Sequence, residues 1–167
     1  VIGFGRFGQI VSQPLLARGH TIAFIDTDVE GIRDGVEFGF KVHYGDGMRL
    51  DILQAAGAAT ARAIIIAIDN KAATKRIAEI CKAEFPLVPV LARSYDRTSS
   101  IELVHAGVDY QIRETFESAL AMAEDALVRL GCEQEAAADV IVEFRRRDAE
   151  RFDLELSGGL YAGRALI

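Results

Sequence analysis

The chain has 167 residues, of which half are hydrophobic and 26% are charged, a composition ordinary for a soluble globular domain. That length is enough for one domain with a substantial core and an appendage. The formal net charge of −6 and the isoelectric point near 5.1 argue against nucleic acid or an anionic membrane surface as a partner. The two cysteines, Cys81 and Cys132, match no metal-binding or redox spacing, so we expect no metal site and a reducing compartment.

The first eight residues predict the end of a buried strand, a glycine-rich turn and the start of a helix. Gly3, Gly5 and Gly8 fit the spacing G-x-G-x-x-G. The first glycine permits the tight turn, the second lets backbone N–H groups reach a phosphate, and the third lets helix and strand pack closely. Asp26 follows the next apolar run, at about the 20-residue spacing typical of the acid that binds a ribose. The alternative is a glycine turn needed only for packing.

Strand and helix alternate along the chain after this turn. Apolar periodicity and breaker residues predict helices over 6–18, 29–37, 48–56, 71–85, 97–106 and 116–130, and strands over 21–25, 40–44, 63–68, 88–92 and 109–112. Together with the strand that ends at Ile2, this alternation predicts an α/β fold over residues 1–130, with a doubly wound, parallel, six-stranded sheet of the Rossmann type.

The character of the sequence changes beyond Gly131. Residues 131–156 are rich in charge but carry apolar residues at intervals, which predicts an appended C-terminal amphipathic helix. Residues 157–167 contain three glycines and are expected to form a flexible tail.

Ligands of doubly wound sheets bind beyond the carboxyl ends of the strands, where the strand order reverses. The predicted strand ends bring five segments to one rim: Gly3–Phe7, Asp26–Asp28, Gly45–Gly47, Ile68–Asn70 and Arg93. Each acid in these segments has an alternative role as a helix cap, because Asp is a leading cap residue.

The residues available for catalysis distinguish between two classes of protein, an enzyme and a sensor. A nicotinamide dehydrogenase needs a proton donor aimed at the substrate and usually a further domain that holds it. The three histidines fall on unrelated turns and strand ends, and none of the four tyrosines begins a Tyr-x-x-x-Lys motif. A nucleotide site without this chemistry favours a module that binds a nucleotide in order to change shape, and we expect no enzymatic activity.

Four segments resemble a known family: Gly3–Ile10, Val42–Asp46, Ala67–Asp69 and Arg113–Glu117. They are similar to the cytoplasmic domain of Kef-type potassium-efflux antiporters, a member of the RCK (or KTN, Trk-N) group that regulates potassium channels and transporters. The resemblance covers about residues 1–148, and Arg113–Glu117 with Phe144–Arg147 separates the Kef type from generic RCK domains. In this family a membrane antiporter domain precedes the nucleotide-binding one, which agrees with a chain that begins inside a strand.

The resemblance implies a homodimer with an adenine nucleotide, AMP or NAD(H), in each fold. The residues expected to hold it are Gly3, Phe4, Gly5, Arg6, Phe7, Asp26, Thr27, Asp46, Gly47, Ile68, Asp69 and Arg93. Arg6 and Arg93 would lie near phosphate. NADP is disfavoured, because its 2′-phosphate would meet the carboxylate of Asp26.

A second ligand is implied in the glutathione-gated members, between the subunits. Its contacts correspond to Gln13, Arg113 and Asp148, and Phe38 matches an aromatic used as a gating lever, with a core position as its alternative. Arg113 keeps a guanidinium suited to a carboxylate. The family usually has Arg where this chain has Gln13 and Asn where it has Asp148, and both differences lower the expected affinity for an anionic tripeptide.

We therefore expect a regulatory domain of a Kef-like potassium/proton antiporter, on the cytoplasmic face of the inner membrane, that responds to a nucleotide and to a glutathione-type ligand. The alternatives are an RCK subunit of another potassium channel or transporter, and a small NAD-dependent oxidoreductase.

Overall fold

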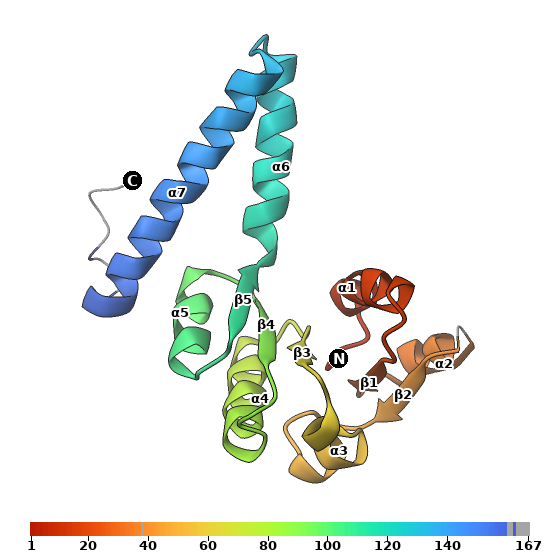
Figure 1. The fold of residues 1–167 in the computed structure, drawn as a ribbon. Helices are drawn as coiled ribbons and strands as arrows, with labels where there is room; N and C mark the ends of the chain where they lie inside the picture. The colour runs from red at the N-terminus through yellow and green to blue at the C-terminus, as the bar shows by residue number, and fades with distance from the viewer. Residues whose placement is uncertain (38, 160–161, 163–167) are drawn as a thin grey trace. The chain divides into compact units, whose positions relative to one another are not determined.

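The computed structural model describes residues 1–37, 39–159 and 162, without the side chains of Asp34 and Glu37 (Figure 1). Phe38, expected as a gating lever, lies outside the described residues. The elements in chain order are α1 (Arg6–Ala17), β1 (Ala23–Asp26), α2 (Val29–Glu37), β2 (Lys41–Tyr44), α3 (Leu50–Ala55), the 3₁₀ turn η1 (Ala58–Thr60), β3 (Ile64–Ile66), α4 (Lys71–Glu84), β4 (Val90–Ser94), α5 (Arg97–His105), β5 (Tyr110–Arg113), α6 (Glu114–Arg129) and α7 (Gln134–Gly158).

The described residues form two compact units. The first comprises Val1–Ser94 with Glu102–Ile112 and contains the strands. The second comprises Tyr95–Ile101 and the described part of the chain from Arg113 onward, so that α6 belongs with α7.

The sheet of the first unit is centred on Ile2. β1 pairs in parallel with β2, from Ala23 opposite Lys41 to Asp26 opposite Tyr44, and β3 pairs in parallel with β4. β5 is the hydrogen-bonded neighbour of β4. Ile2 forms parallel bridges to Ile25 of β1 and Ile66 of β3, and so joins the two halves. The predicted α/β fold with a parallel sheet is confirmed, but five strands form, and the expected first strand is reduced to the bridges at Ile2.

The resulting order is β2-β1-Ile2-β3-β4-β5. The chain adds β1 and β2 on one side of Ile2, then crosses over and adds the other three strands on the opposite side. The order therefore reverses between Ile2 and β3, which is the position where doubly wound sheets bind ligands.

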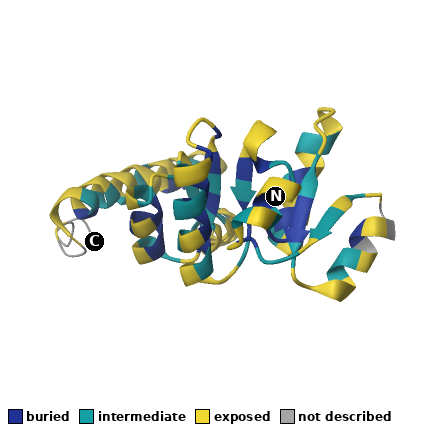
Figure 2. Cartoon of the chain, turned by 90° about the horizontal axis from the view of Figure 1, so that it is seen from below, coloured by how far each residue is buried: buried dark blue, intermediate teal, exposed yellow. Residues whose placement is uncertain are grey.

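Apolar side chains fill the space between strands and helices, and Figure 2 shows the buried residues gathered on the strands and the inner faces of helices. The main cluster includes Ile66, Ile77 and Val90. Burial among these residues raises the pKa of the Cys81 thiol to about 11, which makes it an unreactive core residue. A second group stacks the rings of Phe4, Phe24 and Phe40 edge to face, with centroids 4.7 to 5.7 Å apart.

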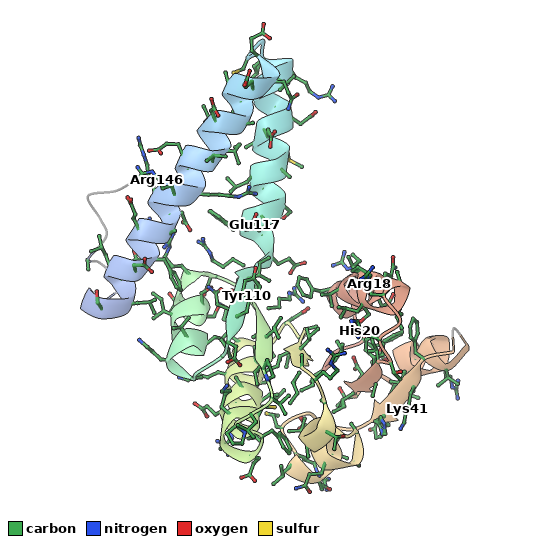
Figure 3. All side chains as sticks on the ribbon, in the orientation of Figure 1. Arg18, His20, Lys41, Tyr110, Glu117 and Arg146 are labelled. Carbon is green, nitrogen blue, oxygen red and sulfur yellow. The ribbon has the colours of Figure 1, made fainter. Side chains whose placement is uncertain are left out.

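In the second unit α6 and α7 run antiparallel, joined by a turn in which Gly131 has a φ of +97° (Figure 1). Phe116 stacks on Phe144 at 6.1 Å, and Glu117 accepts a hydrogen bond from Arg145 at 2.7 Å; Figure 3 shows the side chains of both helices, with Glu117 labelled. The appended helix was predicted, and α7 runs on through Gly158. None of the helices in the described part of the chain combines the length and apolar character that crossing a bilayer demands.

Candidate nucleotide site

The turn between Ile2 and α1 lies at the point where the strand order reverses. Gly3 has a φ of +101°, and a Cβ there would lie 2.9 Å from Cγ2 of Ile68 and 3.1 Å from the carbonyl carbon of Ala67. A Cβ at Gly8 would lie 2.1 Å from the carbonyl oxygen of Gly3. Packing within the protein therefore requires glycine at both positions, and together the two glycines hold the first turn of α1 against the sheet.

Gly5 differs from these two glycines. Its φ is −70°, which any residue adopts, and a Cβ there would meet no atom of the described residues within 4 Å. Neither conformation nor packing explains glycine at this position. The open space leaves room for a group that approaches the backbone, which is the role expected of the second glycine of the motif.

The N-terminus of α1 is available to an anion. Its cap residue is Gly5, which has no side chain to bond the first amides, and its first turn, Arg6 to Gln9, has no acid. The first amides of a helix have no partner within the helix, and the helix dipole adds positive potential to them. This end of α1 is therefore suited to a phosphate.

Asp26 faces the glycine turn from the end of β1. Its Oδ2 accepts a hydrogen bond from the backbone N–H of Phe4 at 2.6 Å, and its Oδ1 accepts one from the N–H of Asp28 at 2.8 Å. A carboxylate has about four acceptor positions, so each oxygen keeps one for a further donor. Thr27 is exposed beside it. The Phe4 ring is buried in the aromatic cluster, so Phe4 contributes its backbone to the turn.

Arg93, from β4, lies among residues of the turn and of the segment after β3. Its guanidinium is 5.4 Å from the centroid of the Phe7 ring, donates to the carbonyl of Ala67 at 3.4 Å and pairs with Asp69. The Arg93 side chain is 16% exposed and that of Asp69 84% exposed. The structure thus brings Phe7, Ile68, Asp69 and Arg93 together, as the strand ends predicted. Arg6 is exposed at the start of α1.

Asp46 and Gly47 have local structural roles. Asp46 Oδ1 accepts a hydrogen bond from the N–H of Met48 at 2.8 Å, in the turn that leads to α3. A Cβ at Gly47 would lie 2.7 Å from Cγ2 of Ile2, so packing under the sheet requires glycine there. The alternative role considered for the acids, a helix cap, does not apply to Asp46, because the cap residue of α3 is Arg49; Asp46 stabilises the turn before it.

The residues expected for a second ligand are divided between the two units. Gln13 is exposed on α1 in the first unit. Arg113 and Asp148 both belong to the second unit, where they form an ion pair. Arg97 pairs with the same carboxylate and was not singled out from the sequence, where it is the first residue of the helix predicted over 97–106.

Comparisons with known proteins agree with this geometry. Residues 1–114 match the family model of the TrkA-N domain. A glutathione-regulated potassium-efflux system protein of Haemophilus influenzae is 43% identical over 159 residues, which are 95% of this chain and 26% of that protein. The Kef C-terminal domain of Shewanella denitrificans, solved in an AMP-bound form, superposes with a TM-score of 0.83 at 31% identity, over 93% of this chain and 95% of that one.

The TrkA-N domain of the Escherichia coli inner membrane protein ybaL has the same fold, with a TM-score of 0.69 at 24% identity over 74% of this chain and 91% of that one. These findings confirm the resemblance to Kef-type domains, and by their names the relatives support the expectation that this domain is not an enzyme. The chain spans 26% of the length of the Haemophilus influenzae protein.

The contrast between Gly8 and Gly5 is testable by thermal unfolding. Gly8→Ala should lower the free energy of unfolding by about 3 kcal/mol, because its methyl group overlaps the carbonyl of Gly3. For a chain of this size that corresponds to a melting temperature lower by about 6–12 °C. Gly5→Ala, the matched control, should stay within about 1 kcal/mol of the parent. Equal melting temperatures for the two variants would contradict the packing described here.

Proposed function

The chain belongs to the TrkA-N domain family, and we propose that it is the nucleotide-binding regulatory domain of a Kef-type potassium-efflux antiporter. The observation that carries the proposal is the uncovered N-terminus of α1 beside Gly5, in a fold shared with an AMP-bound Kef domain. The transporting part would precede this domain in the same polypeptide and place it at the cytoplasmic face of the inner membrane. An upstream reading frame without membrane-spanning segments would instead favour a separate RCK subunit.

The proposed ligand is an adenine nucleotide, AMP or NAD(H). Its phosphate would lie on the amides of the glycine turn, where Gly5 leaves space. Its ribose hydroxyls would donate to Asp26, whose carboxylate already faces this turn. Arg93, held beside Phe7, and Arg6 supply positive charge nearby. Regulation requires that the ligand bind two arrangements of the transporter with different affinities, because a ligand with equal affinity for both shifts nothing.

A homodimer is part of the proposal, and an apolar groove of α6 and α7 supports it. The groove measures about 370 Å³ and is lined by Leu120, Ala123, Ala126, Leu127, Leu130, Val140, Ile141 and Phe144. Leu130 is 86% exposed, and Val140 and Phe144 are each 52% exposed. Apolar patches of this kind mark interaction sites, because water disfavours them on a monomer.

The ribose assignment is tested by calorimetry with AMP. Asp26→Ala should weaken AMP binding at least about fivefold, since a hydrogen bond of about 1 kcal/mol or more is lost. The same variant should narrow the preference for NAD over NADP, because the carboxylate that repels a 2′-phosphate is gone. Asp139→Ala, which removes an exposed acid from α7, is the control. Unchanged AMP affinity in Asp26→Ala would refute the assignment.

The second-ligand assignment is tested at Gln13. Gln13→Arg should strengthen the binding of glutathione several-fold, because it restores a positive charge for an anionic tripeptide. Gln54→Arg adds the same charge at an exposed position on α3 and should change nothing. A Gln13→Arg variant that responds like Gln54→Arg would remove Gln13 from the proposed site.

The dimer is tested by light scattering coupled to size-exclusion chromatography. Val140→Glu places a charge in the groove of α6 and α7 and should convert a dimer into a monomer. Val29→Glu, at a similarly exposed valine on α2, should leave the dimer intact. If both variants keep the mass of the parent dimer, the groove is not the interface.

A further inference from the structure

The distal half of α7 carries two acids with little exposure to solvent, Asp148 and Glu155. Within the described residues 148–158, only Glu155 is buried, and its side chain is inaccessible to solvent. The buried apolar residues of α7, Ala137 and Ile141, lie in its first half, whereas Phe152 and Leu156 of the distal half are only partly buried. Two acids of this half, Asp148 and Glu155, make largely buried ion pairs with arginines.

Two guanidiniums converge on the first of these acids. Arg97, the first residue of α5, pairs with Oδ1 of Asp148, and Arg113, the last residue of β5, pairs with Oδ2. Arg97 also lies 3.5 Å from the backbone carbonyl of Asp148. Each arginine side chain is 16% exposed and that of Asp148 12% exposed. The Arg113 guanidinium rests 3.9 Å from the centroid of the Phe116 ring, which fixes its plane.

Arg97 is shared with Glu155. Arg151 donates from Nε to Glu155 Oε1 at 2.8 Å, and Arg97 approaches Oε2 at 3.4 Å. Oε2 is within ion-pair distance of Arg97 but has no hydrogen bond from the described residues. The cluster thus contains three guanidiniums and two carboxylates, a surplus of one positive charge in a largely dry environment.

We propose that Arg97 and Arg113 form a carboxylate-binding pair that the chain fills with its own Asp148, so that a small external carboxylate binds there only in exchange for Asp148. Two arginines that each take one oxygen of a single carboxylate are arranged as for a bound anion. The tethered Asp148 competes at an effective concentration that dissolved anions do not match. This deepens the proposed function and rests on it, because Arg113 and Asp148 belong to the proposed second-ligand set.

If an external carboxylate exchanges with Asp148, removing the charge of Asp148 should leave Arg97 and Arg113 able to bind that carboxylate. Asp148→Asn keeps the shape of the side chain and removes the charge that satisfies both arginines. Asp153→Asn makes the same change of net charge at an exposed position one and a half turns along α7 and is the matched control. The double variant Asp148→Asn/Arg113→Gln also removes one of the two guanidiniums that would bind the external carboxylate.

The test titrates the 167-residue chain with succinate, by calorimetry and by thermal shift. Asp148→Asn should bind succinate at least tenfold more tightly than the parent, and its melting temperature should rise with succinate. Asp153→Asn should behave like the parent, and the double variant should lose the gain. If Asp148→Asn does not fold alone, Asp148→Ser is titrated in its place. An equal response of the Asp148 and Asp153 variants, or a gain that survives Arg113→Gln, overturns the proposal.

An AMP titration in parallel separates this proposal from the nucleotide-binding one. Asp148→Asn should keep the parent's affinity for AMP, because Asp148 has no part in the glycine turn. If AMP binds none of these proteins while succinate still distinguishes Asp148→Asn from Asp153→Asn, the nucleotide proposal fails and the carboxylate pair stands.

Discussion

The close approach of Gly8 to the carbonyl oxygen of Gly3 is the contact on which the nucleotide site depends. A Cβ at Gly8 would lie 2.1 Å from that oxygen, so α1 starts as near to the sheet as a backbone allows. The same turn connects to Ile2, whose bridges to β1 and β3 join the two halves of the sheet. The first amides of α1 are thereby held at the point of strand reversal, and Gly5 provides no side chain that would cap them.

The glycine turn and the position of Asp26 were predicted well from the sequence because their determinants are local. A glycine spacing fixes a turn, and an acid at the end of the next strand faces that turn, as the hydrogen bond from Phe4 to Asp26 shows. Helix α4 was predicted almost to the residue, since Asn70 caps it and Pro86 follows its end. The first strand, expected to end at Ile2, is present only as the bridges of Ile2 to its neighbours, and η1 was missed between α3 and β3.

The interaction partners of side chains were harder to predict from the sequence than the positions of the residues in the fold. The sequence placed Asp46 and Gly47 at a strand end, but it could not show that Asp46 bonds Met48 or that Gly47 packs under Ile2. Arg113 and Asp148 were singled out as contacts of an external ligand. Their pairing with each other, across 35 positions of sequence, depends on the packing of α7 against α6 and on the angle of the turn between them. Neither property is encoded in a local pattern.

The two proposed anion sites use different donors, and this decides how each is controlled. Backbone amides at α1 hold their position through glycine packing, and the first turn of the helix, Arg6 to Gln9, contains no acid. Guanidiniums on long side chains reach further and can bind any carboxylate, so a single acid on α7 is enough to occupy both Arg97 and Arg113. A substitution of Asp148 alone would therefore change the occupant of the second site, whereas the amides of the first site depend on the packing of Gly3 and Gly8. The largely buried pairs of Asp148 are also screened by salt far less than the exposed pairs of Arg146 with Glu143 and Glu150, so the occupation of Arg97 and Arg113 by Asp148 depends little on ionic strength.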